Sequence, residues 1–416
     1  MFVGGVVRDC LLGIRSEDFD VSTTLDPEAL ADVFPNLDRR FGVVHEELTG
    51  GVLTISSLRR DGEYLDRRHP STVTFVSSPE EDAPRRDFTI NALYADPWSG
   101  EITDPCGGRR DLATRTLRVI GDAHARLCED PLRLLRAVRF AARMNLEPTP
   151  ETDAAIRSLA GELSVVSRER VFQELTMAFV GPGRGRALQL LVEWGLAEHV
   201  LPEVVALQGV EQPPEFHPEG DVFVHVCSVL EHVVPGDEVQ AWAAVLHDLG
   251  KPATFERAAD RIRFSGHDTL SAKMADGVLR RLKAPNELRE TVVEVCRDHI
   301  KFAGIEQMKP VRRERWMRSP RFVAHLEFHR ADCEGSHRKL DIYHRARETF
   351  HSLPPEPPPP LCTGADVIQR GVAEGPLVGE ILRRLHRELE DLGVSTRESA
   401  LEHLDGLVQE SFRGDE

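Results

Sequence analysis

The sequence predicts an α/β domain at the amino end and an all-α remainder. Residues 1 to about 122 combine strand-like runs with paired glycines, and from about residue 123 apolar residues recur at helical spacing with glycine and proline stops. We therefore expect a head followed by three helical segments, at 1–122, 123–218, 219–350 and 361–416. The run Pro354 to Pro360 predicts a stiff linker before the last segment.

Composition is typical of a soluble globular protein. The chain has 416 residues, of which 41% are hydrophobic and 29% charged. No apolar run approaches the roughly 20 residues of a membrane span, and no secretory signal is visible. The seven cysteines form no CxxC pair, which argues against a disulfide framework or a zinc knuckle. We expect a cytoplasmic protein without a membrane partner.

The net charge of −17 argues against a diffuse binder of polyanions. A local basic groove can still supply phosphate contacts to a nucleic acid. If RNA binds, the basic residues must be concentrated on one face.

Two aspartates near the start predict a metal site. Asp18 and Asp20 flank Phe19 in a strand-like run, and side chains two apart in a strand share a face. Mg²⁺ prefers hard oxygen ligands, and two such ions about 3.5–4 Å apart can serve phosphoryl transfer. The alternative is a solvated strand edge.

A glycine pair precedes these aspartates. Gly4 and Gly5 follow a short apolar start and open a helix-like run, Val6 to Leu12. Glycine permits close backbone approach, N–H groups at a helix start attract phosphate, and Arg8 can reach the same anion. Either motif alone is also compatible with an ordinary turn or edge, but their order within one short βαβ-like start is more specific.

At this point the chain resembles a known family. GGVVRDCLLG followed by EDFDVST resembles the nucleotidyltransferase head of the bacterial tRNA nucleotidyltransferase (CCA-adding enzyme) and poly(A) polymerase family, class II. The resemblance implies a head with a DNA polymerase β-like mixed sheet, followed by an all-α neck, body and tail. In this family the strand at Gly51 to Leu58 often carries a third carboxylate. Thr54 stands there in this chain, so Asp87 or water would have to fill the position.

The segment RRDFTINAL at 85–93 closely matches a second signature of the family. The match implies that Arg86 contacts the triphosphate or the sugar of the nucleotide. The alternative is an exposed arginine pair whose neighbours Phe88 and Ile90 belong to the core.

A charged stripe predicts the base-selection site. Asp130, Arg133, Arg136 and Arg139 recur every third residue of a helix that begins near Pro131. A carboxylate only accepts hydrogen bonds and a guanidinium only donates them, so Asp130 with Arg133 suits cytosine and adenine and opposes uracil and guanine. The family uses EDxxR here as a protein template, which Glu129, Asp130 and Arg133 match. Arg136 and Arg139 are expected to support this pocket or the phosphates, with a solvated face as the alternative.

A histidine constellation follows, and it resembles the HD phosphohydrolase superfamily. Histidine and aspartate are good ligands for transition metals. The pattern is matched by four residues, and two more resemble the additional ligands of some members: His225, His247, Asp248 and Asp332, then His267 and His299. Such a site would cleave phosphate esters through a metal-activated hydroxide, with Lys251 orienting phosphate. An inert RNA-binding body is the alternative.

Other basic residues are candidates for RNA contacts, with surface solvation as the alternative. They include Arg168, Arg170, Arg184 and Arg186. The stretch KPVRRERWMRSPR at 309–321 contains Trp316, which can stack on a base or belong to a helical connector.

The leading hypothesis is a template-independent enzyme that adds CCA to tRNA 3′ ends from CTP and ATP with Mg²⁺, releasing pyrophosphate, without an obligate protein partner. Poly(A) polymerase and partial CC- or A-adding enzymes share these motifs. A different class is an HD phosphohydrolase with a vestigial head, which the Thr54 departure favours. A non-enzymatic RNA-binding protein would leave both constellations unexplained.

Overall fold

The computed structural model describes residues 1–16, 18–49, 51–215, 217–259, 261–356, 359–394 and 396–413. The chain forms two compact units. The first comprises residues 1–296 with 335–337, and the second comprises the rest of the described chain. The segment 219–350 therefore contributes residues to both units. In the part of the chain that is described, no helix has the length and apolar character needed to span a membrane.

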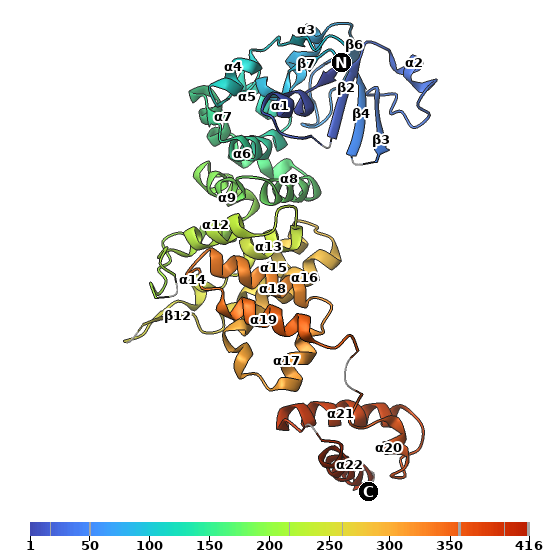
Figure 1. Ribbon diagram of the computed structural model, residues 1–416. Coiled ribbons are helices and arrows are strands. Elements are labelled where there is room, and N and C mark those ends of the chain that lie inside the picture. The colour runs from blue at the N-terminus through green and yellow to red at the C-terminus, as the bar shows by residue number, and fades with distance from the viewer. Residues whose placement is uncertain are drawn as a thin grey trace. The chain divides into compact units, whose positions relative to one another are not determined.

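A six-stranded mixed sheet forms the head (Figure 1), which confirms the predicted fold class. Strands β2 and β4 are parallel, and all other neighbours in the sheet are antiparallel. In spatial order the strands are β3 (Val43–Leu48), β4 (Gly51–Ser57), β2 (Asp18–Thr23), β1 (Phe2–Val3), β7 (Tyr94–Ala95) and β8 (Ile102–Thr103).

Strand β1 has only two residues, yet it lies in the middle of the sheet. Phe2 pairs with Val21 on one side and with Ala95 on the other. The expected strand at 72–76 is present as β6 (Val73–Phe75), but it pairs with β5 (Arg59–Asp61) in a separate hairpin. The expected first helix is α1 (Gly5–Leu11).

Short helices and turns complete the head. They are α2 (Pro27–Ala31), α3 (Pro79–Asp82), η1 (Ala83–Arg85), η2 (Thr89–Asn91) and α4 (Gly108–Ala113). Two further short strands, β9 (Thr116–Leu117) and β10 (Glu147–Pro148), pair in parallel.

Helices take over at α5, as the sequence predicts. The helices are α5 (Ala123–Glu129), α6 (Leu132–Met144), α7 (Pro150–Ser158), η3 (Ala160–Val165), α8 (Arg168–Val180), α9 (Arg184–Glu193), α10 (Ala197–Val200) and α11 (Pro202–Val205). Helix α6 packs against α8 and α9. Its apolar residues Leu134, Leu135, Val138 and Ala141 are all buried.

The first unit continues with helices that carry the histidine motif. They are α12 (Val222–His232), α13 (Glu238–Leu246), α14 (Lys251–Thr254), α15 (His267–Arg281) and α16 (Asn286–Asp298), with a small hairpin of β11 (Glu256–Arg257) and β12 (Ile262–Arg263) between α14 and α15. Asp221 caps α12 by accepting a hydrogen bond from the backbone N–H of Val224 at 3.0 Å.

The second unit contains η4 (His299–Gln307), α17 (Pro310–Met317), α18 (Phe322–Glu334) and α19 (Asp341–Ser352). Trp316, a candidate for stacking on RNA, packs instead against the hydrophobic cluster of this unit. Its ring centroid lies 4.9 Å from that of Phe302 and 5.3 Å from that of Phe322. The structure therefore favours the connector interpretation of the 309–321 stretch.

The terminal segment has its own core. Helices α20 (Gly364–Ile368), α21 (Pro376–Leu392) and α22 (Arg397–Arg413) bury Val367, Leu385 and Leu404 among themselves. Of the predicted linker, Pro357 and Pro358 lie outside the described residues.

Candidate nucleotide and metal sites

One pocket of about 740 Å³ lies in the first unit, lined by the head and by α6 and α8. It brings together every residue that the sequence predicts for nucleotide or magnesium binding, namely Gly5, Arg8, Asp18, Asp20, Arg86, Asp130, Arg133, Arg136 and Arg139. Their individual roles stay predictions. The lining also includes residues that were not assigned to the site from the sequence, among them Asp9, Asn91, Phe140, Arg143, Arg170 and Met177.

Strand β2 presents the two aspartates to this pocket. Asp18 is exposed and Asp20 half-buried, and Ser22, two residues further along the same face, is buried. Burial raises the pKa of Asp20, which Arg86 opposes and the neighbouring Asp18 reinforces. Two carboxylates on one strand face, one of them partly desolvated, form a donor set that fits divalent cations.

Thr54 lies beside Asp20, in the place where the family often has a third carboxylate. The parallel pairing of β2 and β4 sets Asp20 opposite Thr54, and β3 sets His45 opposite Thr54 on the other side. His45 Nδ1 and Thr54 Oγ1 are 3.0 Å apart. The row of side chains therefore runs from carboxylate to hydroxyl to imidazole. His45, which the sequence interpretation missed, is thus a neighbour of the predicted metal position.

Both carboxylate oxygens of Asp87 are already engaged by neighbouring residues, so its part in the metal shell stays a prediction. Its Oδ1 accepts hydrogen bonds from the backbone of Phe88 and the Asn91 amide, and its Oδ2 accepts one from Arg136 at 2.8 Å. Burial alone would raise the pKa of Asp87, but Arg136 and Asn91 outweigh it and hold the pKa far below its usual range. Asp87 is therefore a fixed counter-charge for Arg136.

The glycine pair allows the start of α1 to approach strand β2, which carries Asp18 and Asp20. Gly4 has φ +70°, and a Cβ there would lie 3.5 Å from the Asn91 carbonyl and 3.9 Å from Asp20 Oδ2. One turn later Arg8 donates to Asn91 Oδ1 at 2.6 Å and pairs with Asp9 at 2.7 Å. Asp9 also pairs with Arg143 of α6 at 2.9 Å, so this carboxylate joins α1 to the neck.

Arg86 is held from three directions. Its Nε donates to Asp82 Oδ2 at 3.0 Å and to the Tyr94 hydroxyl at 3.0 Å, and its Nη2 reaches Ser22 Oγ at 3.4 Å. Burial alone would raise the pKa of Asp82, but Arg86 and Arg85 outweigh it and hold the pKa at about 2. The guanidinium of Arg86 is thereby fixed beside β2.

Three arginines of the pocket surround one aromatic ring. The guanidinium carbons of Arg8, Arg136 and Arg139 lie 5.1, 5.2 and 4.6 Å from the centroid of Phe140. Cation–π contacts are worth about 0.5–2 kcal/mol each, depending on solvation. Phe140 is therefore a shared support for three positive charges, a role that the apolar pattern of α6 alone does not reveal.

The two predicted base-reading residues do not pair with each other. Asp130 receives Arg170 of α8 through both carboxylate oxygens, at 3.2 and 2.7 Å. Arg133 pairs with Glu129 at 2.9 Å and donates to the carbonyl of Arg126 at 2.6 Å. Each of the two predicted base readers is thus held by its own partner, and Arg170, a candidate for RNA phosphate contacts, lines the same pocket.

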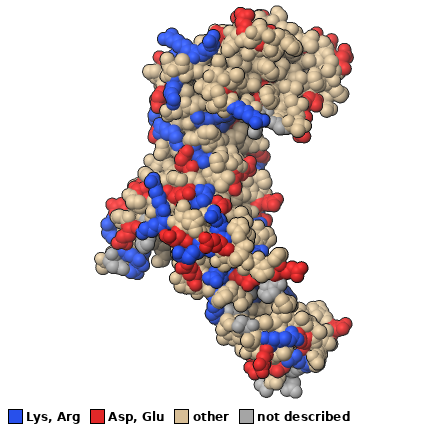
Figure 2. All heavy atoms as spheres, in the orientation of Figure 1, with Lys and Arg blue, Asp and Glu red and all other residues tan. Residues whose placement is uncertain are grey.

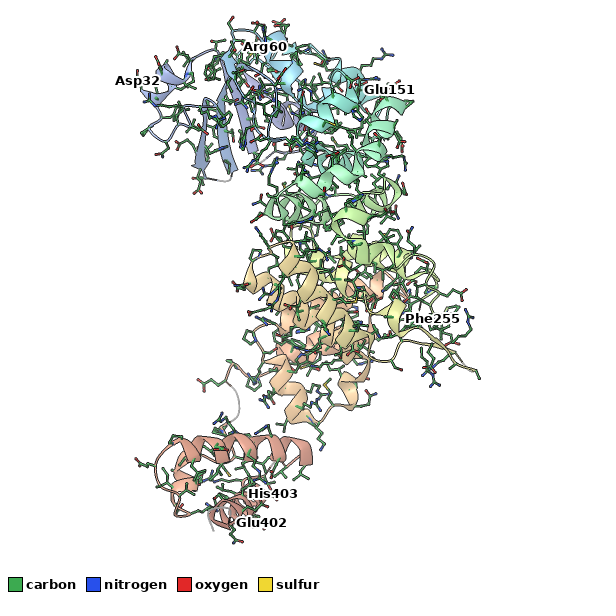
Figure 3. The ribbon with its side chains drawn as sticks, turned by 180° about the vertical axis from the view of Figure 1, so that it is seen from behind. Asp32, Arg60, Glu151, Phe255, Glu402 and His403 are labelled. Carbon is green, nitrogen blue, oxygen red and sulfur yellow. The ribbon has the colours of Figure 1, made fainter. Side chains whose placement is uncertain are left out.

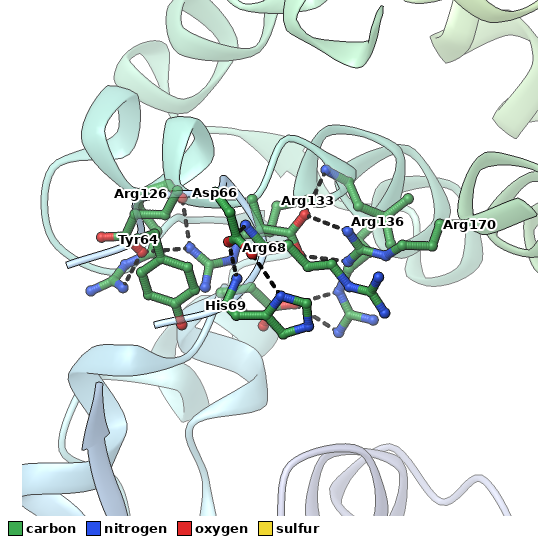
Figure 4. Close-up of polar contacts among 12 residues, drawn as sticks. Tyr64, Asp66, Arg68, His69, Arg126, Arg133, Arg136 and Arg170 are labelled. Carbon is green, nitrogen blue, oxygen red and sulfur yellow. Dashed lines mark hydrogen bonds and ion pairs between the residues drawn. The ribbon is translucent and has the colours of Figure 1, made fainter. Parts of the chain in front are cut away.

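The segment between β5 and β6 covers the Arg133 side of this site. Figure 4 shows Tyr64, Asp66 and His69 of that segment beside Arg126 and Arg133. The guanidinium of Arg133 lies 5.7 Å from the Tyr64 ring, and the Tyr64 hydroxyl donates to Asp61 at 2.7 Å. Burial, the hydrogen bond to Asp61 and its charge raise the pKa of Tyr64 to about 12, so the phenol stays neutral.

A second cluster of chemical groups lies on α12 to α15. His247 Nδ1 contacts the carbonyl of Ala244 at 3.0 Å, and His267 Nδ1 contacts that of Phe264 at 2.8 Å. A carbonyl only accepts, so Nδ1 carries a proton in both rings, and the neutral form of each ring would offer the Nε2 lone pair to a metal. These Nε2 atoms lie 3.2 and 3.6 Å from the carboxylate oxygens of Asp248.

His225 completes the part of the cluster that belongs to the first unit. Its Nε2 lies 3.3 Å from His247 Nε2 and 3.6 Å from Asp248 Oδ2. Imidazole nitrogens that converge on a buried carboxylate form a donor set that fits a transition metal. Burial alone would raise the pKa of Asp248, but His247 and Lys251 outweigh it and keep the pKa well below its usual range.

Lys251 is buried and pairs with Asp248 at 2.7 Å, and it also donates to Gln212. These contacts use two of the three donors of the ammonium group, and the role of Lys251 in orienting phosphate stays a prediction. His299 and Asp332 lie in the second unit, on η4 and α18, and their part in the ligand set stays a prediction.

Acidic and basic side chains are interspersed over the face shown in Figure 2, with lysine and arginine gathered on the head near α4. The acidic net charge therefore does not prevent local basic regions, which RNA binding would require.

Three family models match the chain. They are the poly A polymerase head domain at residues 1–118, the probable RNA and SrmB-binding site of polymerase A at 145–207, and the HD domain at 226–340. The two resemblances expected from the sequence motifs are thus confirmed.

Among solved structures, the Bacillus stearothermophilus CCA-adding enzyme in complex with CTP matches with a TM-score of 0.72 at 26% identity, covering 99% of this chain and 94% of that one. The Thermotoga maritima CCA-adding enzyme complexed with tRNA-CCA shares the fold, with a TM-score of 0.54 at 20% identity over 97% of this chain and 90% of that one.

Curated relatives extend the likeness. The multifunctional CCA protein of Cupriavidus metallidurans is 36% identical over 354 residues, which cover 80% of this chain and 84% of the relative. That of Aromatoleum aromaticum is 38% identical over 321 residues, covering 74% and 76%. A likeness of this strength over three quarters of both chains means that the chain belongs to the family of multifunctional CCA proteins.

Proposed function

We propose that this chain adds CCA to the 3′ end of tRNA, using CTP and ATP and releasing pyrophosphate. The observation that supports this most directly is the single pocket in which the carboxylates of β2 lie with the arginines of α6. Asp18 and Asp20 would hold two Mg²⁺ ions, whose chemistry is activation of the attacking 3′-hydroxyl and stabilisation of the leaving pyrophosphate.

The arginines supply the nucleotide contacts in this proposal. Arg8 and Arg86, each fixed by a buried carboxylate, would bind the triphosphate and sugar beside Gly5. Arg136 and Arg139 would support the phosphates or the base pocket from α6. Their counter-charges are already in place, so little reorganisation is required when the anionic substrate binds.

Base choice would rest on Asp130 and Arg133. The carboxylate accepts from the amino group of cytosine or adenine, and the guanidinium donates to the adjacent ring nitrogen. Uracil or guanine would leave buried polar groups unpaired, at about 1–3 kcal/mol each. Asp130→Ala should therefore lose the preference for CTP and ATP over UTP and GTP, and unchanged selectivity would refute the template role.

The deciding experiment is single-nucleotide extension. Purified protein receives Mg²⁺ and tRNAs ending before CCA, after C and after CC, with each NTP given separately. Addition of two C and one A followed by a stop is the expected result. Long A tails would instead indicate a poly(A) polymerase, and addition of only CC or only A a divided activity.

The metal role is tested by variants of the same pocket. Asp18→Ala with Asp20→Ala should eliminate incorporation. Asp32→Ala is the matched control, because Asp32 is exposed at the end of α2 and does not line the pocket (Figure 3). Retained incorporation in the double variant would overturn the mechanism.

A second activity is supported by the converging Nε2 atoms of His225, His247 and His267. We propose that these residues and Asp248 hold a transition metal, whose chemistry is activation of water for hydrolysis of a phosphate ester. The test is hydrolysis of 2′,3′-cyclic nucleotides and 2′-phosphates with Ni²⁺, Mn²⁺ or Co²⁺ and without NTP. An HD domain serving only as RNA-binding body predicts no hydrolysis with any of these metals.

A further inference from the structure

Glu219 lies just before α12, and its carboxylate contacts Nδ1 of His225. Its Oε1 is 2.8 Å from His225 Nδ1. The Glu219 side chain is only 11% exposed. A carboxylate only accepts, so this contact favours a proton on Nδ1 of His225, and the neutral ring then presents its Nε2 lone pair towards His247 and Asp248.

His225 differs from His247 and His267 in the partner of its Nδ1. His247 and His267 each use the backbone carbonyl three residues earlier, a contact that the chain supplies whatever the side chain at that position. His225 uses a side chain six residues earlier. Its orientation thus depends on one replaceable residue, and this dependence can be tested by mutation.

Hydrogen bonds hold the chain on both sides of Glu219. Gln212 N donates to the carbonyl of Gly220 at 2.9 Å, and Gly209 N donates to Asp221 at 2.7 Å. Oε1 of Glu219 also lies 3.0 Å from Nδ1 of His217. The rings of His217 and His225 pack edge to face, with centroids 4.7 Å apart. Glu219 is therefore fixed by contacts of its own.

We infer that Glu219 is a positioning residue for the metal centre on α12 to α15, where it sets the tautomer and the ring orientation of His225. This inference rests on the proposed metal site. Carboxylate partners of metal-binding histidines raise the basicity of the ligand and fix its direction, and their loss typically weakens metal binding by about 10–100-fold.

The test measures Co²⁺ binding by the full chain in excess Mg²⁺, which occupies carboxylate sites but does not take imidazole ligands. The proteins are wild type, Glu219→Ala, Glu219→Gln and Glu215→Ala. Glu215 is exposed in the same segment and is the matched control. Equilibrium dialysis gives affinity and stoichiometry, and the visible Co²⁺ spectrum reports the ligand set.

Glu219→Ala should weaken Co²⁺ binding about 10–100-fold with an altered spectrum, whereas Glu215→Ala should match wild type. Addition of C to tRNA should be unchanged in all variants, because Glu219 is not among the residues of the nucleotide pocket. If Glu219→Ala lost this addition as well, Glu219→Gln, which keeps the shape and an accepting oxygen but not the charge, would carry the test with a smaller loss.

Two outcomes would overturn the inference, and they are distinguishable. If wild type binds Co²⁺ and both Glu219 variants bind it equally tightly with the same spectrum, Glu219 does not position His225. If wild type itself binds no Co²⁺ in excess Mg²⁺, the proposed metal centre fails and the role of Glu219 fails with it.

Discussion

Four arginines of the nucleotide pocket, Arg8, Arg86, Arg136 and Arg139, are each held by a buried carboxylate. Arg86 illustrates this, because Asp82 at the end of α3 and Tyr94 of β7 both accept from its Nε. Asp82 is fully buried and also accepts from the backbone N–H of Arg59 at 3.0 Å. Such a carboxylate contributes both to the stability of the head and to the geometry of the site.

Asp82→Asn should therefore destabilise the head in a pH-dependent way. The folded-state pKa of Asp82 is about 2, against 3.8 ordinarily. The ionised Asp82 carboxylate therefore contributes about 2 kcal/mol to the free energy of unfolding. This contribution is present above about pH 4 and is lost as the pH falls from about 4 to about 2. Urea unfolding of wild type and variant at pH 7, 4 and 3 should show a difference that shrinks with acidity. A difference independent of pH would contradict this account.

Phe140→Leu should raise the KM for CTP more than it lowers kcat. The ring supports Arg8, Arg136 and Arg139, which would bind the triphosphate in ground and transition states alike. Phe88→Leu is the control, because Phe88 is buried and packs edge to face on Phe140 at 5.7 Å. Initial-rate kinetics should give a several-fold rise in KM for Phe140→Leu only; equal effects of both variants would mean a general packing defect.

At the scale of elements, α8 completes a site that α6 begins. Arg170, Glu174 and Met177 are spaced four and three residues apart, so they share one face of α8. Glu174 pairs with Arg139 at 2.5 Å, and Arg170 holds Asp130. The sequence SRERVFQELTM contains this spacing, which shows that the three residues share a face but not which element that face packs against.

Arg170→Gln should relax base selection without abolishing addition. Asp130 would lose its two-point partner and could turn away from the incoming base. Incorporation of UTP relative to CTP should rise by about 5–150-fold, which corresponds to 1–3 kcal/mol. Arg168→Gln is the matched control, because Arg168 lies two residues earlier in α8 and does not line the pocket. It should leave the CTP:UTP ratio unchanged. Competition assays with both nucleotides measure this ratio, and an unaltered ratio in Arg170→Gln would contradict the positioning of Asp130.

At the scale of the molecule, two sites of different chemistry occupy different elements of the first unit. The nucleotide pocket is built by the head with α6 and α8, and the histidine cluster by α12 to α15. One site offers hard carboxylate oxygens and the other imidazole nitrogens, which select different metals.

The two activities should therefore be separable. Asp20→Ala should abolish nucleotide addition and leave phosphate-ester hydrolysis intact, and His247→Ala should do the reverse. A chelator selective for transition metals, added in excess Mg²⁺, should stop hydrolysis alone. Loss of both activities in either variant would show that the sites are coupled.

The local sequence by itself determined the strand with Asp18 and Asp20, the arginine stripe of α6 and the ordered histidine motif. These depend on residues close in the chain, where a period of two or three residues fixes which side chains share a face. Only the tertiary structure decided the partners. That Asp82 holds Arg86, that Arg170 rather than Arg133 pairs with Asp130, and that Trp316 belongs to a core depend on how distant elements pack, and local periodicity carries no information on that packing.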